Sequence, residues 1–248
     1  TLADDAQAKI LNGKIIPGDR VFYPVKSHIR SSVPKTEKNN LNGKKCVIAP
    51  EKAHKKWIAM IEERGGSQCE VPDTGKTYEE RKKASPTDLY IHDTGNLPNF
   101  SKLTELSRHE WDELVNKFFF GPALLTAQGS LNYYAGIFPG GSDDPRKFKD
   151  AKGRTVIIGP ALPAGKKISG HERAKVEVFR GALRSFVTTV NQELSDVLKS
   201  NIRVFLILPG TVDGKEPSDE NIMNTINYLM SDEAASSSEV IFCPDETR

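Results

Sequence analysis

The turn at residues 49–56 decides what chemistry this chain could perform, because it joins a short apolar strand to a helix. We expect the strand within 41–48 and the helix over 56–64. Such a strand–turn–helix unit can hold a pyrophosphate at the helix N-terminus where glycines let the backbone approach closely. The turn reads Ala-Pro-Glu-Lys-Ala-His-Lys-Lys, without a glycine, and Pro50 removes an N–H that a phosphate would need. The sequence therefore predicts the architecture of a dinucleotide site without its phosphate-binding chemistry.

Composition is typical of a soluble globular protein: of the 248 residues, 37% are hydrophobic and 27% charged. A net charge of +2 is too small to indicate nucleic-acid binding. No apolar run approaches the roughly 18 residues that span a bilayer. Cys46, Cys69 and Cys243 lack metal-ligand spacing. We therefore expect no metal site, and three buried, reduced thiols.

The first 40 residues are punctuated by prolines, and the chain begins with Thr1 rather than methionine. We expect residues 1–40 to form an irregular arm that packs on this domain or on a neighbour, with a targeting remnant as the alternative. Residues 41–248 are expected to form one domain. The expected compartment is reducing, either the cytoplasm or an organelle matrix, with the mitochondrial matrix included.

Hydrophobic periodicity predicts strands that alternate with helices beyond this first unit. Ser107 and Glu110 have the spacing of a capping box, which would start a long helix running through Leu131. A near-continuous apolar run at 201–208 is typical of a strand covered on both faces. The other expected elements are strands at 67–71, 88–91, 153–158 and 239–243 and helices at 169–196 and 217–230. This alternation predicts an α/β fold with a doubly wound parallel sheet.

Six short stretches follow one another in a collinear pattern. They are 41–44, 92–95, 111–115 with 121–122, 153–156, 202–204 with 209–212, and 229–234. From residue 41 to the C-terminus, their order resembles the short-chain dehydrogenase/reductase family, especially its 3-oxoacyl-thioester reductases. The resemblance implies a Rossmann-like sheet flanked by helices.

The resemblance also implies where a catalytic set would lie, and those positions are degenerate here. Active members use a Tyr to move the proton, a Lys to lower its pKa and bind the ribose, a Ser to hold the substrate oxygen, and a helping Asn. The Tyr and Lys positions carry His171 and Lys175. The Ser position falls on Pro160 or the neighbouring Gly159, and the Asn position on Phe118. Lys175 alone of this set is retained.

The cofactor-binding positions implied by the resemblance are altered in the same way. The glycines of the phosphate loop fall on Pro50, His54 and Lys56, whereas Gly95 and the turn Pro209-Gly210 remain. We therefore expect no cofactor, with NADP or NAD as the alternative.

Two family segments lack room in this chain. Between Gly66 and Asp88 there is space for one strand and one short helix, which predicts a shortened adenosine-side half of the sheet. The helix expected at 217–230 follows soon after Thr211, where active members insert a helical lid.

These losses together predict a pseudoenzyme of the family that serves as a structural or assembly subunit through protein–protein contacts. The helices at 107–135 and 169–197 are expected to carry a homo-oligomer or hetero-oligomer interface, as equivalent helices commonly do in this family. Within Phe118-Phe119-Phe120, Phe118 would fill the former nicotinamide pocket and one neighbour would face a partner; a plain core role is the alternative. The pattern is also similar to the degenerate, flavodoxin-like N-terminal module of large two-domain oxoacyl reductases, which serves assembly.

Two other functions remain open. One is a working NAD(P)-dependent oxidoreductase of the 3-oxoacyl-thioester reductase type, with His171 and Lys175 moving the proton. The other is a small-molecule or acyl-thioester binding module that uses the crevice at the strand ends.

Overall fold

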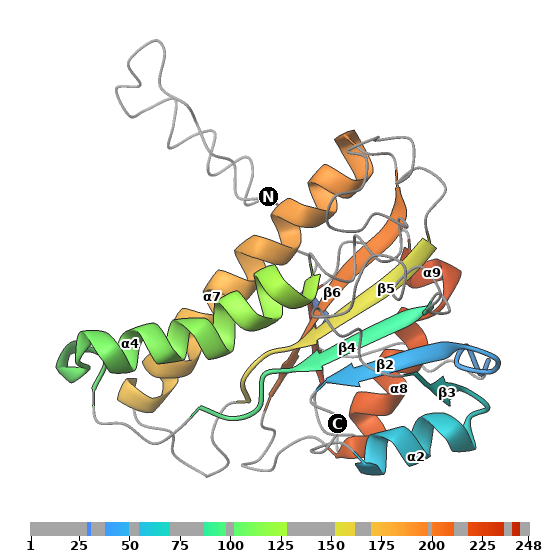
Figure 1. The fold of residues 1–248 in the computed structure, drawn as a ribbon, viewed down its shortest axis with the longest axis horizontal. Coiled ribbons are helices and arrows are strands. Elements are labelled where there is room, and N and C mark those ends of the chain that lie inside the picture. Colours follow the sequence, from blue (N-terminus) through green and yellow to red (C-terminus); the bar gives the residue numbers. More distant parts are fainter. Residues whose placement is uncertain are drawn as a thin grey trace, which may run out of the picture.

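A single parallel sheet organises the computed structural model of the chain, with helices on both of its faces (Figure 1). The structure describes residues 29–30, 38–49, 55–69, 87–97, 102–127, 152–161, 170–197, 200–210, 218–235 and 240–243. The strands in these ranges are β1 (Ile29–Arg30), β2 (Lys45–Ala49), β3 (Ser67–Gln68), β4 (Leu89–Asp93), β5 (Lys152–Ile158), β6 (Asn201–Pro209) and β7 (Val240–Cys243).

The strands lie in the order β1-β7-β6-β5-β4-β2-β3, and every neighbouring pair is parallel. From β2 the chain steps outward to β3, whereas from β4 it proceeds in the opposite direction through β5 and β6 to β7. The strand order therefore reverses between β2 and β4, which confirms the predicted doubly wound sheet. In the described part of the chain, β3 is the outermost strand beside β2; residues 70–86, on which the predicted shortening of the adenosine side rests, lie outside the described ranges.

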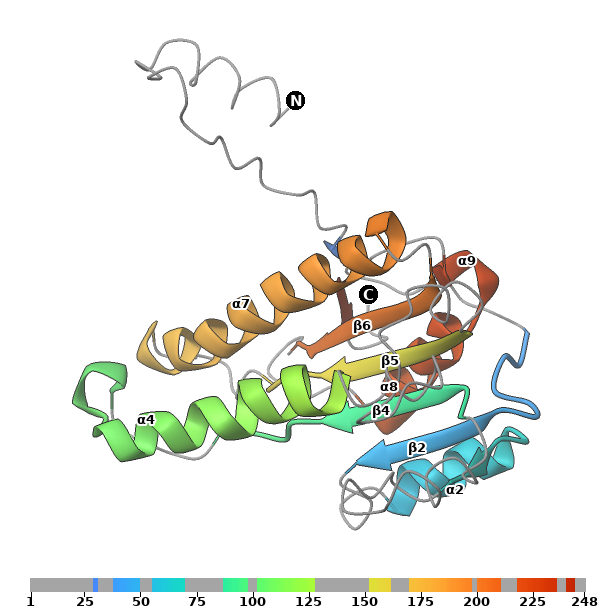
Figure 2. The ribbon, with the colours of Figure 1, turned by 45° about the horizontal axis from the view of Figure 1, so that its top comes forward.

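Two groups of helices cover the sheet. The helices α2 (Lys55–Glu63), α8 (Asp219–Leu229) and α9 (Asp232–Ala235) lie on one face. The other face carries α4 (Arg108–Val115) with its π-helical continuation η3 (Asn116–Ala127), and α7 (Gly170–Gln192) with its π-helical continuation η4 (Glu193–Val197). A short 3₁₀ turn, η2 (Leu103–Glu105), precedes α4. Figure 2 shows α4 and α7 side by side on the same face.

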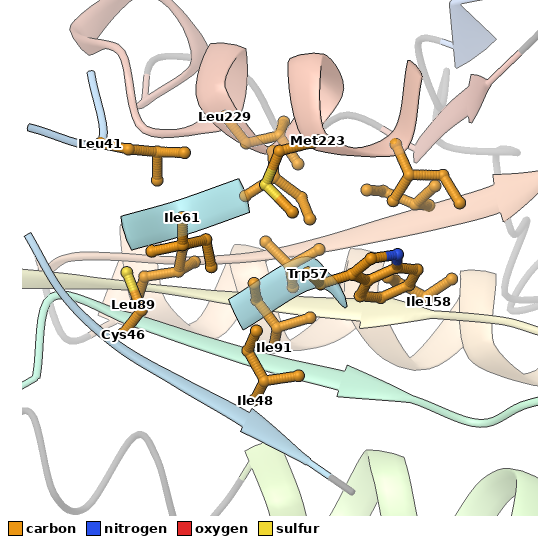
Figure 3. Close-up of a cluster of buried hydrophobic side chains, with 14 of the residues drawn as sticks. Leu41, Cys46, Ile48, Trp57, Ile61, Leu89, Ile91, Ile158, Met223 and Leu229 are labelled. Carbon is orange, nitrogen blue, oxygen red and sulfur yellow. The ribbon is translucent and has the colours of Figure 1, made fainter. Parts of the chain in front are cut away.

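Strand β6 has the burial that its apolar run predicts. Phe205 and Ile207 are fully buried toward α2 and α8, whereas Leu206 and Leu208 are fully buried toward α7. Both faces of the strand are thus covered, which confirms the prediction for 201–208. Figure 3 shows the cluster on the α2 and α8 face, where side chains of the strands meet Trp57 and Met223.

The predicted capping box is present at the start of α4. The Ser107 side chain accepts a hydrogen bond from the backbone N–H of Glu110, and the Glu110 carboxylate accepts one from the N–H of Ser107 at 2.8 Å. The Ser107 hydroxyl also donates to Glu110 Oε2 at 2.6 Å, and this bond, together with that from the Ser107 N–H, lowers the pKa of the Glu110 carboxyl. The helix predicted to run through Leu131 is present up to Ala127, where this described range ends.

The N-terminal arm contributes a strand that the sequence did not lead us to expect. In β1, Ile29 lies opposite Val240 and Arg30 opposite Ile241, so that β1 pairs with β7. Residues 1–28 and 31–37 lie outside the described ranges, and the domain boundary at residue 41 stays a prediction.

Asn191 of α7 supplies hydrogen bonds to the backbone of β6. Its amide Nδ2 donates to the carbonyl oxygen of Val204 at 2.5 Å, and its Oδ1 accepts from the N–H of Val204 at 3.0 Å. The described pairing between β6 and β7 begins two residues later, at Leu206. Asn191 therefore satisfies two buried backbone groups where that ladder has not yet begun.

Replacing Asn191 with Leu should lower the free energy of unfolding by about 2–4 kcal/mol, because the N–H and C=O of Val204 lose these partners while remaining buried. Urea denaturation followed by circular dichroism measures the change. The exposed neighbour Gln192 is the control, and Gln192→Ala should change stability by less than about 0.5 kcal/mol. Equal stability of the two variants would contradict this role for Asn191.

Candidate functional site

The carboxyl ends of β2, β4, β5 and β6 form the sheet edge where open α/β folds bind ligands. Ala49, the last residue of β2, lies opposite His92 in β4, and Asp93 lies opposite Ile158 in β5. The segments that follow these strands therefore start side by side at the point where the strand order reverses. Pro50 and His54 lie outside the described residues.

The Asp93-Thr94-Gly95 segment forms a tight turn after β4. The Gly95 N–H donates to Asp93 Oδ1 at 2.9 Å, and the Thr94 N–H donates to the Ile158 carbonyl oxygen at 3.0 Å. Gly95 has a φ of 71°, a left-handed conformation that favours glycine. No atom lies within 4 Å of the position that a Cβ would take there. The backbone conformation, rather than a close approach of neighbours, therefore explains this glycine.

Lys56 lies in the first turn of α2 and forms an ion pair with Asp219. Its Nζ lies 2.6 Å from Asp219 Oδ2, and the indole Nε1 of Trp57 donates to Asp219 Oδ1 at 2.7 Å. Asp219 thus places a carboxylate beside the first turn of α2. Lys56 balances the charge of this carboxylate, so the pair adds no net charge at this helix end.

Pro160 and Pro209 are joined by a side chain that the sequence analysis did not single out. Arg180 of α7 is only 1% exposed. Its Nε donates to the Pro160 carbonyl oxygen at 2.8 Å, and its second terminal nitrogen, Nη2, donates to the Pro209 carbonyl oxygen. Nη1 lies 3.5 Å from Glu177 Oε1. Burial lowers the pKa of the Arg180 guanidinium to about 10, partly offset by Glu177.

One signal in the sequence could have identified Arg180. It follows Val176 by four residues and precedes Leu183 by three, and both of these side chains lie on the buried face of α7. A charged residue at helical spacing between apolar core positions needs buried hydrogen-bond partners. The two proline carbonyls are these partners. They lie 20 and 29 residues from Arg180, so a local sequence pattern cannot identify them.

Phe118 is completely buried and packs on α7. Its ring centroid lies 5.6 Å from that of Phe179, and Leu114 belongs to the same cluster. Phe119 is partly buried near Phe186, at 6.3 Å between ring centroids, whereas Phe120 is 42% exposed. The triplet therefore spans core and surface, and the prediction that Phe118 fills a former nicotinamide pocket stays untested.

His171 and Lys175 lie one turn apart at the start of α7, with His171 exposed and Lys175 half-buried. Helical geometry places the two side chains on one face of the helix. A catalytic role for either residue stays a prediction.

The cysteines differ in their surroundings. Cys46 is fully buried, and this burial, with a smaller effect of Asp88, raises the pKa of its thiol to about 12. Cys69 is half-buried, so the prediction of a buried thiol is wrong there, because this residue follows β3, a strand at one edge of the sheet. The side chain of Cys243 lies outside the description. Within the described ranges, no three His, Cys, Asp or Glu side chains lie together so as to hold a metal ion.

A nicotinamide dinucleotide is the group that this type of sheet edge would hold in a reductase. Beside the first turn of α2, where its diphosphate would lie, the described charges include Lys56 and Asp219, which form an ion pair. No helix in the described part of the chain is both long and apolar enough to cross a bilayer.

Comparison with known proteins shows what the fold resembles. No protein-family model and no curated protein matches the sequence. Among solved structures, a 3-ketoacyl-(acyl-carrier-protein) reductase from Brucella melitensis complexed with NADH matches with a TM-score of 0.55 at 13% identity, over 83% of this chain and 98% of that chain. An NADH-dependent reductase, A1-R', complexed with NAD matches with a TM-score of 0.54 at 13% identity, over 83% and 97%.

The acetoin dehydrogenase YohF from Salmonella typhimurium matches with a TM-score of 0.54 at 13% identity, over 83% of this chain and 87% of that chain. The structural neighbours of this chain are thus short-chain dehydrogenase/reductases. Their similarity confirms the predicted Rossmann-like fold. At such low identity the likeness concerns the fold alone.

The two described thiols should differ in reactivity toward iodoacetamide. In a Cys243→Ser chain at about pH 8, Cys69 should react roughly tenfold or more faster than Cys46, whose buried thiol holds its proton. Mass spectrometry of peptides after timed alkylation measures both rates. In denaturant the two rates should converge, and rapid native alkylation of Cys46 would contradict the enclosed site.

Proposed function

We propose that this chain is a catalytically inactive relative of the short-chain reductases that serves as a structural or assembly subunit. Its partners would be other protein chains, either copies of itself or a related reductase, bound through α4, η3 and α7. The fold that it shares with solved reductases provides the scaffold, and the surface of these helices provides the contact.

The observation that carries this proposal is the location of exposed apolar side chains. In the part of the chain that the structure describes, the large hydrophobic side chains that remain exposed are Trp111 (37%), Phe120 (42%) and Val178 (42%). Trp111 belongs to α4, Phe120 to η3 and Val178 to α7, so that all three lie on one pair of neighbouring helices. Exposed apolar groups that gather on one face, rather than scatter singly, are typical of an interaction surface.

The exposed side of α7 has a second property of a helix interface. Small side chains recur there at helical spacing. The exposed positions with small side chains are Ala174, Gly181, Ser185 and Thr189, which lie beside Val178, whereas the exposed residues nearer the helix ends include His171, Arg173 and Gln192. No atom lies within 4 Å of a Cβ position at Gly181. A strip of small residues lets another helix approach closely, whereas a solvated helix face ordinarily carries charges.

Polar pairs on α4 are suited to the rim of such an interface. Arg108 lies 3.5 Å from Asp112, and His109 lies 3.5 Å from Glu113, each pair one turn apart and exposed. Charged side chains at a rim contribute little affinity but orient the partner.

The absence of catalysis is supported by the side chains at the family's catalytic positions. Pro160 cannot hold a substrate oxygen as a serine would, and the ring of Phe118 is buried against Phe179. The Brucella reductase was crystallised with NADH; for this chain we infer that neither NADH nor NADPH binds.

Neither NADH nor NADPH should raise the melting temperature of the purified protein at sub-millimolar concentration, because a ligand stabilises only what it binds. An active 3-oxoacyl reductase serves as the positive control in the same assay. A rise of several degrees, or reduction of a 3-oxoacyl thioester that Lys175→Ala abolishes, would support the oxidoreductase alternative instead.

Val178→Glu should dissociate the assembly. A charge buried in an apolar contact without a partner weakens association by roughly 100-fold or more. Native mass, measured by light scattering on the purified protein and by size exclusion of cell extract, should fall to that of a smaller species. Ala59→Glu is the matched control, because Ala59 is exposed on α2, on the opposite face of the sheet. A wild-type monomer in extract, or equal masses of the two variants, would contradict the proposal.

A further inference from the structure

Arg180 is the largest side chain among those that the described part of the chain encloses completely. A buried guanidinium is costly unless its donors find acceptors, and here the acceptors are backbone carbonyls at the ends of two adjacent strands. One is the carbonyl of Pro160, just after β5, and the other that of Pro209, the last residue of β6. Neither carbonyl belongs to the helix that carries Arg180.

We propose that Arg180 is an internal latch that closes the carboxyl edge of the sheet between β5 and β6. Its guanidinium occupies the place between the two strand ends and binds the carbonyls that face it. This inference goes beyond the proposed function, because the latch would operate whether or not the chain assembles with partners.

The planar guanidinium is suited to this task. Its donors point in fixed directions, so that one side chain can bind two separate acceptors at once. Hydrogen bonds from a charged donor are stronger than those between neutral groups. A lysine at the same position would bring a single nitrogen and could not bridge the two strand ends in the same way.

Among the described residues, one carboxylate and two further arginines influence Arg180. Glu177 lies 3.5 Å from Arg180 Nη1 and is also 3.6 Å from Arg184 Nη2, so that one carboxylate serves two arginines. Arg173, in the first turn of α7, adds a third positive charge to this group. Because Glu177 is shared, the strand-end carbonyls must carry much of the stabilisation of the Arg180 guanidinium.

Close packing surrounds the latch. A Cβ at Gly159 would lie 2.8 Å from Leu208 Cδ2 and 3.3 Å from Leu183 Cδ1, so that β5, β6 and α7 meet here without room for a methyl group. The Gly159 N–H also donates to the Ile207 carbonyl oxygen at 2.9 Å. This amide reports whether the two strand ends remain joined.

Removal of the Arg180 side chain should leave a cavity lined by hydrogen-bond acceptors that can bind a guanidinium ion. In Arg180→Ala, the carbonyls of Pro160 and Pro209 would face Glu177 across the vacated space. A small planar cation should bind there and restore part of the lost stability.

Three variants of the full chain test the latch. Arg180→Ala should lower the melting temperature by roughly 5–10 °C, because buried acceptors lose their partner. Methylguanidinium at about ten times its Kd should recover about 3 °C in this variant and nothing in the wild type. Arg180→Met fills the volume without donors, and Arg180→Lys keeps the charge. Both should accelerate hydrogen exchange of the Gly159 amide by at least about tenfold.

The matched control is Arg184→Ala, which removes an arginine that also faces Glu177, one turn further along the same helix. It should leave the exchange of Gly159 unchanged and show no rescue by methylguanidinium. If Arg180→Ala does not fold, the Met and Lys variants decide. Stability of Arg180→Met equal to or above the wild type, with unchanged exchange at Gly159, would overturn the latch. Binding of NADH by the wild type would overturn the proposed function but leave these exchange rates as the separate test of Arg180.

Discussion

Strands β5 and β6 must be covered on both faces, and the other features of the molecule follow from this constraint. The two strands pair along seven positions, from Lys152 with Asn201 to Ile158 with Ile207. Their side chains alternate between two apolar clusters, so helices are required on each side of the sheet. Because all the described pairs are parallel, the carboxyl ends of the strands meet at one edge, and α7 begins beside them. Packing alone therefore creates a place where a site can form.

The chemistry at the carboxyl edge of the sheet depends on individual side chains rather than on the packing of the strands. At the positions where the family resemblance predicts catalytic groups, two side chains or carbonyls of this chain take part in internal contacts. Phe118 belongs to an apolar cluster with Phe179, and the carbonyl of Pro160 is bound by Arg180. Asp219 faces Lys56 and Trp57 beside the first turn of α2. The scaffold and the chemistry rest on different residues, so one can be retained while the other is lost.

The sequence predicted those parts of the structure that depend on local patterns. The apolar run of β6, the capping box at Ser107 and the periodicity of α7 each contain enough residues to indicate an element and its buried face. Arg180 could not be assigned in this way, since its carbonyl partners lie 20 and 29 residues away. Strand β1 has only two residues, too few for an alternating pattern, and its pairing with β7 joins opposite ends of the chain.

Helix α7 carries both the latch and the exposed strip of small residues, on opposite sides. Its buried side is fixed to the strand ends by Arg180 and to the middle of β6 by Asn191. A ligand that needed the strand ends to separate would have to break the contacts of Arg180 and displace the helix. The same displacement would move Val178 and Gly181 on the exposed side. For the assembly role proposed above, the contacts of Arg180 would hold this surface in one position.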